Sequence, residues 1–399
     1  DDIRLARQRI EPFVVRTPCP RTRTLDDMAD GALYLKLEGL QRTGSFKDRG
    51  ALNRMMHLSA DERRRGVVTA SAGNHAQAVA YHAQRLGIPC TVVMPETAPL
   101  IKVVNTRSFG ATVLQVGLVL DDSAVEARRL VEDEGRVMIH PFDDPLVIAG
   151  QGSMGLEIVE DVPEVDTVVV PIGGGGMISG IALAVKAARP DARIIGVEAE
   201  AAPSALASRR AGHIELITSH RTLADGIATK RIGEHTFPII EALVDDIVTV
   251  SEDQIASSIL MLMERQKAVV EGAGAVALAA LAAGHFSTSV TGHTVLVLSG
   301  GNIDVNIISR IIDRGLLADG RLARLRIKVP DQPGSLERLT HIVAGLGANV
   351  LETSHRRGFA DITLGDVEIV FTLETRGQDH VHEIVTTLEG EGLTVAQGA

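Results

Sequence analysis

The chain has 399 residues, too many for one compact core, so we expect two or three domains. Hydrophobic residues make up 45% of the chain and charged residues 23%, which excludes a disordered or fibrous protein. The formal net charge of −11 argues against a general nucleic-acid or anionic-membrane binder, because both need a basic face.

The cysteines and the apolar segments narrow the cellular context. Cys19 and Cys90 cannot form a disulfide framework and show no metal-ligand spacing, so each is expected to be a simple thiol. The mixed charges of residues 1–12 show no signal peptide, and the longest apolar run, 272–284, is too short to span a bilayer. We therefore expect a cytoplasmic protein.

The first segment with chemical interest is TGSFKDRGA, residues 43–51. Ser45 and Asp48 predict a helix capping box, which places Lys47 in the first helical turn. The helix field disfavours an ammonium group there, and partial burial beside Phe46 would lower the lysine pKa further. A neutral amine can condense with an aldehyde, so the position suits a Schiff-base lysine. The alternative is a solvent-exposed lysine with no such role.

From about residue 66, short β-branched runs alternate with amphipathic stretches. This rhythm predicts parallel sheets covered by helices, in two lobes that divide near Gly150, with a ligand at the carboxyl ends of the strands. The predicted strands are 67–71, 90–95, 111–117, 136–142, 167–172, 192–198, 246–250 and 294–299.

Two loops carry polar groups at the ends of predicted strands. SAGNHAQ, residues 71–77, leaves a strand and enters a helix, an arrangement that suits an α-carboxylate. Its ligand groups come from Ser71, Ala72, Gly73, Asn74 and His75. SGGN, residues 299–302, puts the hydroxyl of Ser299 at a strand carboxyl end. Taken alone, either loop is explained as well by an N-cap or a turn.

Four consecutive glycines, Gly173–Gly176, stand between a predicted strand and a predicted helix. They let the backbone approach closely and direct several N–H groups to one point, so we expect a phosphate site. The layout also resembles a dinucleotide-binding fold, with Glu198 where a ribose-binding acid would stand. That fingerprint needs a glycine where this chain has Ser179, so a single phosphate fits better.

The pattern changes after Asp319 and Gly320. Strand-like segments at 321–329, 348–357, 364–376 and 393–397, with helices within 330–347 and at 378–392, predict a ferredoxin-like β-α-β-β-α-β unit. His380 and His382 are two apart on the second of these helices and point to different sides, so we expect surface histidines and no metal there.

The segments TGSFKDRGA, SAGNHAQ, PIGGGGM and LSGGNID, in this order, resemble the pyridoxal-phosphate-dependent threonine/serine dehydratases of the tryptophan-synthase-β fold, fold type II. The resemblance covers about residues 5–315. It implies a two-lobed α/β catalytic domain with parallel sheets over residues 1–318, with a smaller lobe at about 48–150.

The resemblance also implies roles for single residues. Pyridoxal 5′-phosphate would be held on Lys47 as an internal aldimine, with Phe46 beside the ring, Asn74 at the ring 3-hydroxyl, Ser299 at the pyridine nitrogen and Glu271 on the substrate side. Backbone N–H groups of Gly173, Gly174, Gly175, Gly176 and Met177 would hold the phosphate. Ser71, Gly73 and His75 would receive the substrate carboxylate.

The implied reaction is β-elimination from L-threonine, with L-serine as a second substrate, giving 2-oxobutanoate or pyruvate and ammonia. Within the family, a serine racemase is the alternative, but Ala72 stands where that enzyme needs a hydroxyl on the opposite face. An NAD-dependent oxidoreductase and a non-enzymatic amino-acid sensor are the alternatives from other classes.

Two further features separate the relatives. The segment SFKDRG, with Asp48 after the lysine, also resembles threonine synthase. We explain Asp48 here as the cap partner of Ser45. Some racemase-like members bind a divalent cation at positions matching Glu198, Ala202 and Ser204. A carboxylate is expected at the last of these, so no metal is expected in this chain.

The C-terminal unit, 324–399 after a linker at 319–323, resembles an ACT domain through PDQPGSL (330–336) and GAN (347–349). The resemblance implies an amino-acid effector, isoleucine or valine, bound between subunits of a homodimer or homotetramer, and control of isoleucine biosynthesis. The candidate effector contacts are Asp331, Gly334, Leu336 and Asn349. The alternative is a dimerisation module that binds nothing.

Overall fold

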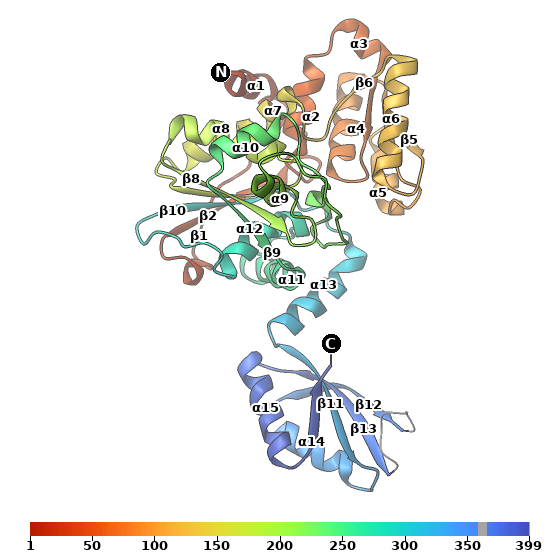
Figure 1. Ribbon diagram of the computed structural model, residues 1–399, viewed down its shortest axis with the longest axis vertical. Helices are drawn as coiled ribbons and strands as arrows, with labels where there is room; N and C mark the ends of the chain where they lie inside the picture. The colour runs from red at the N-terminus through yellow and green to blue at the C-terminus, as the bar shows by residue number, and fades with distance from the viewer. Residues whose placement is uncertain (358–364, 399) are drawn as a thin grey trace. The chain divides into compact units, whose positions relative to one another are not determined.

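The computed structural model describes residues 1–357 and 365–398, and the chain divides into two compact units, 1–304 and 305–399 (Figure 1). The division falls before helix α13 (Val305–Ala318), whereas the sequence suggested a boundary at 319–323. The expected linker is short, because α13 ends at Ala318 and the next strand begins at Leu322.

Two sheets form the frame of the first unit, and the fold class expected from the sequence is confirmed. The larger sheet has the order β1-β2-β10-β7-β8-β9, in which β1 pairs antiparallel with β2 and the other neighbours pair in parallel. The smaller sheet has the order β5-β4-β3-β6 and is parallel. The strands of the larger sheet are β1 (Arg21–Thr22), β2 (Ala32–Leu37), β7 (Thr167–Pro171), β8 (Arg193–Ala199), β9 (Asp246–Val250) and β10 (His293–Leu298). Those of the smaller sheet are β3 (Val67–Ala70), β4 (Cys90–Met94), β5 (Thr112–Gln115) and β6 (Val137–Met138).

Helices cover both sheets, and their polar and apolar faces follow the sequence pattern. They are α1 (Asp2–Ile10), α2 (Lys47–Met56), α3 (Ala60–Arg65), α4 (Asn74–Leu86), α5 (Leu100–Ser108), α6 (Leu120–Glu134), α7 (Pro145–Asp161), α8 (Gly176–Ala188), α9 (Ser204–Ala211), α10 (Thr236–Leu243), α11 (Glu252–Met261) and α12 (Gly272–Ala282). Shorter turns are η1 (Asp26–Met28), η2 (Glu38–Leu40), η3 (Asp225–Ile227) and the π-helical η4 (Leu262–Gln266). Residues 272–281 of α12 are all buried, which is why this Ala-rich helix is apolar on every side.

The predicted lobe division near Gly150 is not a break in the structure, because α7 runs through it. A Cβ added at Gly150 would lie 2.6 Å from the Arg49 carbonyl oxygen, and one added at Gly50 would lie 2.5 Å from Nε2 of Gln151. Helices α2 and α7 therefore cross in close backbone contact. This crossing ties the helix that begins at Lys47 to the larger lobe.

A buried charge network lies beside this crossing. The Arg49 guanidinium donates to both Glu38 and Glu157, and Lys36 Nζ donates to Glu157 at 2.7 Å. Arg49, Lys36 and Glu38 are fully buried, and Glu157 is 4% exposed. Burial raises the pKa of Glu38, but the charge and hydrogen bonds of Arg49 outweigh it, so the pKa lies below its usual value.

The second unit has the ferredoxin-like order that the sequence predicted. Its antiparallel sheet runs β12-β13-β11-β14, and two helices pack against the apolar core around Phe371 and Leu373. Its elements after α13 are β11 (Leu322–Pro330), α14 (Ser335–Gly345), β12 (Asn349–Arg356), β13 (Asp366–Glu374), α15 (Gln378–Gly390) and β14 (Thr394–Gln397). Leu364, the first residue of the predicted third strand, lies outside the described residues.

The prediction of two surface histidines in this unit is wrong for His380. His380 is only 5% exposed, its Nδ1 accepts from the Arg376 N–H at 3.1 Å, and its Nε2 lies 3.0 Å from the Leu346 carbonyl oxygen. The ring thus ties the start of α15 to the end of α14. His382, two residues on, is exposed as expected.

Both cysteines are free thiols, one in each lobe of the first unit. Cys90 is buried in β4, and Cys19 is partly buried against the core of the larger lobe. Burial raises the pKa of each thiol to about 12.

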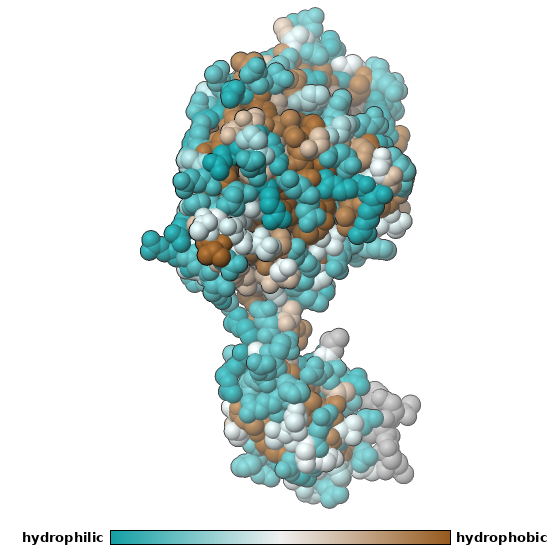
Figure 2. Space-filling view, turned by 60° about the vertical axis from the view of Figure 1, so that its left-hand side comes forward, coloured by the Kyte–Doolittle hydropathy of each residue, from teal (hydrophilic) through white to brown (hydrophobic). Residues whose placement is uncertain are grey.

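Among the residues that the structure describes, no helix combines the length and the apolar character needed to cross a membrane. Figure 2 shows hydrophobic residues scattered among hydrophilic ones on the face of the first unit turned to the viewer. Single exposed apolar residues are normal on a protein surface.

Candidate active site

Lys47 is the first residue of α2, as the sequence predicted, but the predicted capping box is wrong. Asp48 accepts hydrogen bonds from the N–H of Thr43 at 3.1 Å and from its hydroxyl at 2.6 Å. The Ser45 hydroxyl is buried and has no hydrogen-bond partner among the described residues. Gly44, at φ +78°, turns the chain so that Thr43, and not Ser45, reaches the carboxylate.

The amine of Lys47 is held in an enclosed position. Its Nζ donates to the Pro141 carbonyl oxygen at 2.7 Å and lies 5.0 Å from the centre of the Phe46 ring. Burial lowers the pKa of Lys47 to about 8, and the Glu271 carboxylate acts in the opposite direction. Burial therefore favours the neutral form of the amine.

Asn74 and Glu271 face each other across the two lobes. Asn74 opens α4 after β3 of the smaller sheet, whereas Glu271 caps α12 beneath the larger sheet. The Asn74 Nδ2 donates to the two carboxylate oxygens of Glu271 at 2.8 and 3.0 Å. Burial raises the pKa of Glu271 to about 7, and the Asn74 hydrogen bonds act in the opposite direction.

The loop before α4 offers donors for an anion. The Ser71 hydroxyl accepts from the Gly73 N–H at 3.2 Å, so these two residues face each other. Within the described chain, the N–H groups of Asn74, His75 and Ala76 have no recorded protein acceptor. Helix starts of this kind bind carboxylates.

The His75 side chain does not face the same way as these donors. Its ring is 2% exposed and its Nε2 lies 2.8 Å from the Ile139 carbonyl oxygen. Burial, together with the charge of Lys47, lowers the pKa of His75 to about 3, so the ring is neutral. The backbone N–H of His75, and not its imidazole, lies with the donors at the start of α4.

The glycine loop after β7 is shaped for close approach. A Cβ at Gly174 would lie 2.3 Å from the Phe142 ring, and one at Gly176 would lie 2.7 Å from the Phe142 carbonyl oxygen. Gly175 has φ +94° and caps α8. The Thr236 hydroxyl donates to the Gly174 carbonyl oxygen at 2.8 Å, which fixes the loop from the other side.

The N–H groups of Gly173 to Met177 have no recorded acceptor among the described residues. A row of unpaired donors at a helix start, with no room for side chains, fits a phosphate group. Phe142 follows Pro141, the residue that holds Lys47, so the amine and the glycine loop share one neighbouring segment. The residues present thus fit a cofactor that carries both a phosphate and an aldehyde.

Ser299 follows β10 and joins the same site through its backbone. The Phe46 N–H donates to the Ser299 carbonyl oxygen at 3.1 Å, and Ser45 forms an isolated β-bridge with Gly300. Ser299 is 2% exposed. The carboxyl ends of β3, β7 and β10 therefore converge with the start of α2, as the sequence led us to expect.

Glu198 is engaged elsewhere. Its two carboxylate oxygens accept the N–H groups of Ala205 and Leu206 at 2.8 and 2.9 Å, so it caps the start of α9. Both of its oxygens are thereby occupied by backbone donors and are not directed to a ribose. In the part of the chain that the structure describes, no group of three or more His, Cys, Asp or Glu side chains could hold a metal ion.

The four candidate effector residues do not meet within one chain. Asp331 and Gly334 lie in the loop after β11, and Leu336 lies in the first turn of α14. Asn349 begins β12 and pairs with Glu374, which pairs with the first residue of β11. At about 3.3 Å per residue, the length of β11 puts roughly 26 Å between Asp331 and Asn349.

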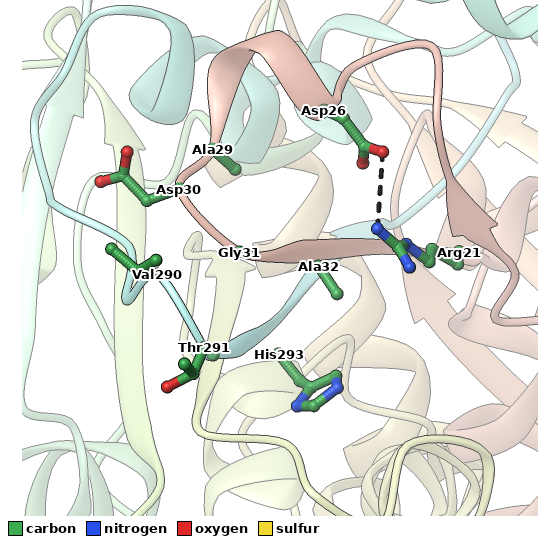
Figure 3. A pocket seen from close by; sticks show the side chains of 10 residues that line it. Arg21, Asp26, Ala29, Asp30, Gly31, Ala32, Val290, Thr291 and His293 are labelled. Atoms are coloured by element: carbon green, nitrogen blue, oxygen red, sulfur yellow. Dashed lines mark hydrogen bonds and ion pairs between the residues drawn. The ribbon is translucent and has the colours of Figure 1, made fainter.

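A polar hollow of about 380 Å³ lies at the end of the larger sheet opposite to the candidate site (Figure 3). It is lined by Arg21, Asp26, 29–32 and 290–293. Ala32 and His293 begin β2 and β10, so the hollow is at the amino ends of strands whose carboxyl ends carry the candidate site. The hollow is therefore separate from the site.

Comparisons with known proteins agree with this geometry. A family model described as pyridoxal-phosphate dependent enzyme matches residues 10–300. The L-threonine ammonia-lyase of Thermotoga maritima is 48% identical over 396 residues, which is 99% of this chain and 98% of the relative.

Two solved structures extend the comparison. The T.th. threonine deaminase is 44% identical, with a TM-score of 0.72, and the match covers 76% of this chain and 98% of that one. Maize serine racemase is 38% identical, with a TM-score of 0.75, over 79% of this chain and 97% of that one. The nicotinamide alternative is excluded by these matches, and the chain belongs to the pyridoxal-phosphate dependent enzyme family.

Proposed function

We propose that this protein is an L-threonine ammonia-lyase that also accepts L-serine. The observation that carries the proposal is the enclosed Lys47 amine, with a pKa of about 8, beside the Asn74 and Glu271 pair and the unpaired glycine-loop donors. The near full-length match to the Thermotoga maritima L-threonine ammonia-lyase supports the choice of substrate.

The residues would divide the work as follows. Lys47 would hold the aldehyde carbon of pyridoxal phosphate. The phosphate would be bound by Gly173, Gly174, Gly175, Gly176 and Met177. Asn74 would bind the ring oxygen, and Ser299 would bind the ring nitrogen. Phe46 would pack beside the ring. When bound, the cofactor supplies a sink for the electron pair left by the broken α-C–H bond.

The substrate carboxylate would be held by the Ser71 hydroxyl and by the backbone N–H groups of Gly73 and His75. These groups orient the amino acid by its carboxylate. The Lys47 amine, whose pKa of about 8 leaves a larger neutral fraction than that of an ordinary lysine, would take the α-proton. Pro141 is the acceptor that holds this amine in place beforehand.

Purified protein treated with borohydride tests the attachment. We expect the peptide containing Lys47 to gain the reduced cofactor mass and the yellow colour to bleach. We expect Lys47→Ala protein to keep its fold and to lose the release of 2-oxobutanoate from threonine. Label on another lysine, or oxo-acid release by Lys47→Ala at the wild-type rate, would refute the assignment.

We infer further that the second unit is a regulatory domain of the ACT type. The T.th. threonine deaminase is matched over nearly its whole chain by 76% of this one, which supports a role for the remainder other than the chemistry itself. Because Asp331 and Asn349 lie at opposite ends of one sheet, an effector site that uses both would be built between two copies of the chain. Isoleucine or valine is the expected effector, and a homodimer or homotetramer the expected assembly.

The Asp331 carboxylate accepts from the Arg357 guanidinium at 2.8 and 2.9 Å, so an effector that uses Asp331 would compete with this pair. Oxo-acid release measured with and without isoleucine and valine tests the proposal, together with Asp331→Asn and the size of the protein in solution. We expect an effect of one of the amino acids that Asp331→Asn weakens. A monomer that neither amino acid affects would contradict it. A cytoplasmic location, which fractionation would check, completes the proposal.

A further inference from the structure

Asn302, in the loop after β10, is hydrogen-bonded to the proposed cofactor-binding residue Asn74. One nitrogen, Nδ2 of Asn302, lies 2.6 Å from the Thr43 carbonyl oxygen and 2.9 Å from Oδ1 of Asn74. The other end of the Asn74 amide meets the two carboxylate oxygens of Glu271. Three polar side chains therefore form a line from a backbone carbonyl to a buried acid.

The backbone carbonyl at one end sets the direction of the whole line. A carbonyl oxygen can only accept, so the atom of Asn302 beside Thr43 must be its NH₂ group. The same NH₂ group meets Asn74, whose facing atom must then be its oxygen. Asn74 is thus left with its NH₂ group turned toward Glu271. The orientation of both amides follows from chemistry.

The start of the line is itself held firmly. The Thr43 N–H and hydroxyl both donate to Asp48, which is fully buried in the first turn of α2 next to Lys47. Gly44 leaves room for the Asn302 amide, because a Cβ there would lie 2.3 Å from Oδ1 of Asn302. The helix that carries Lys47 and the amide of Asn74 are therefore tied to one another through Asn302.

We propose that Asn302 is a positioning residue that fixes Asn74 as a hydrogen-bond donor in the cofactor site. The inference rests on the proposed role of Asn74 at the ring oxygen of pyridoxal phosphate. A donor at this point favours the ionised form of that oxygen, whereas a flipped amide would present an oxygen and disfavour it. Asn302 acts on the cofactor only through Asn74.

Two substitutions test whether Asn302 fixes the orientation of the Asn74 amide. Asn302→Asp keeps the shape but has no NH₂ group to donate, and Asn302→Ala removes the amide without adding a charge. Both should weaken cofactor binding to the apoprotein by about 10- to 100-fold, the cost of a hydrogen bond to a charged group. Both should also lower the visible absorption of the bound cofactor relative to its near-ultraviolet absorption, because the ring oxygen becomes protonated.

Asn53→Ala is the matched control. Asn53 is 1% exposed, and its Nδ2 also donates to a backbone carbonyl, that of Leu146, at 2.7 Å, but it does not contact Asn74. We expect this variant to melt at a lower temperature with the wild-type absorption ratio. Unchanged absorption and cofactor affinity in folded Asn302→Asp and Asn302→Ala would overturn the proposal.

A double-mutant cycle keeps the test decisive if one Asn302 variant is unstable. If Asn302 acts through Asn74, the pair Asn74→Ala and Asn302→Ala should bind cofactor no more weakly than Asn74→Ala alone. Additive losses would refute the proposal. Borohydride labelling of wild-type Lys47 distinguishes failure of the proposed cofactor site from failure of this inference. If Lys47 is not labelled, the proposed site is wrong. If Lys47 is labelled but the Asn302 variants keep the wild-type absorption and cofactor affinity, only the role of Asn302 is wrong.

Discussion

Arg49 and Glu157 form two hydrogen bonds, 2.7 Å from Nη1 to Oε1 and 2.8 Å from Nη2 to Oε2, between α2 and α7. Arg49 lies two residues after Lys47, so this contact anchors the helix that begins with the candidate cofactor lysine. Removing one partner of a buried pair leaves an uncompensated charge, which is far more costly than losing an exposed pair.

Arg49→Met should therefore lower the free energy of unfolding by about 3–5 kcal/mol, because Glu38 would stay buried without the Arg49 charge and Glu157 would keep only Lys36. The matched control is Arg129→Met, since Arg129 pairs with Glu126 and Asp133 on the exposed face of α6. This control should leave the free energy of unfolding nearly unchanged, because water screens exposed pairs. Urea denaturation of both variants checks the difference, and equal losses would contradict the role of burial.

Lys47 should react with an amine reagent at unusually low pH in the apoprotein. Its pKa is lowered to about 8, so labelling of the Lys47 peptide should be half-maximal near pH 8, whereas ordinary lysines follow at about 10.5. Since Glu271 raises this pKa, Glu271→Gln should move the midpoint to lower pH. Mass spectrometry of the labelled peptides provides the measurement, and a Lys47 midpoint equal to that of exposed lysines would refute the prediction.

The same shift has a consequence for stability. Between about pH 8 and 10.5 the unfolded chain binds the Lys47 proton and the folded apoprotein does not, so this group makes unfolding harder as pH rises there. Lys47→Met removes the contribution. The stability of the variant should rise less than that of the wild type over this range in denaturation experiments.

Gly174→Ala should weaken cofactor binding more than tenfold, because its Cβ would lie 2.3 Å from the Phe142 ring and displace the glycine loop. Adding Phe142→Ala should restore part of the binding by making room. Gly390→Ala is the control, as a Cβ at that position at the end of α15 meets nothing within 4 Å. Titration of the apoproteins with pyridoxal phosphate measures the cofactor affinity of all three variants. Wild-type affinity in Gly174→Ala would exclude the glycine loop as the phosphate site.

Ala72→Ser should add a second proton donor and acceptor next to Ser71 and allow some racemisation of L-serine. The similarity to maize serine racemase makes the change a small one in this fold. Chiral chromatography should detect D-serine with the variant and not with the wild type. If elimination continues at the wild-type rate and no D-serine forms, the single hydroxyl is not what separates the two activities.

Local patterns predicted the glycine loop and Asn74 because each lies where a strand meets a helix. Lys47 was placed by the helix-start pattern of residues 43–51. The predicted partner of Asp48 was wrong, because Thr43 and Ser45 each carry a hydroxyl group. Only the turn at Gly44 decides which hydroxyl reaches the carboxylate. The role of Asn302 was invisible for a different reason. Its partners Thr43 and Asn74 are more than 200 residues away in the chain.

Strand β2 is not among the predicted strands, and its sequence ALYLKL carries the charged Lys36 within an apolar run. In the structure Lys36 is fully buried and donates to Glu157, which comes from α7. His380 shows the same limit in the second unit, where the Arg376 N–H, before α15, and the Leu346 carbonyl oxygen, after α14, satisfy a ring that sequence alone placed at the surface. Buried polar side chains are predictable only when their distant partners are known.

The two cysteine thiols can serve as probes of unfolding in each lobe. Cys19 belongs to the larger lobe and Cys90 to the smaller one, and a thiol with a pKa of about 12 resists alkylation. Each becomes reactive only when its own surroundings loosen. The order in which iodoacetamide modifies the two during partial denaturation would therefore record which lobe opens first.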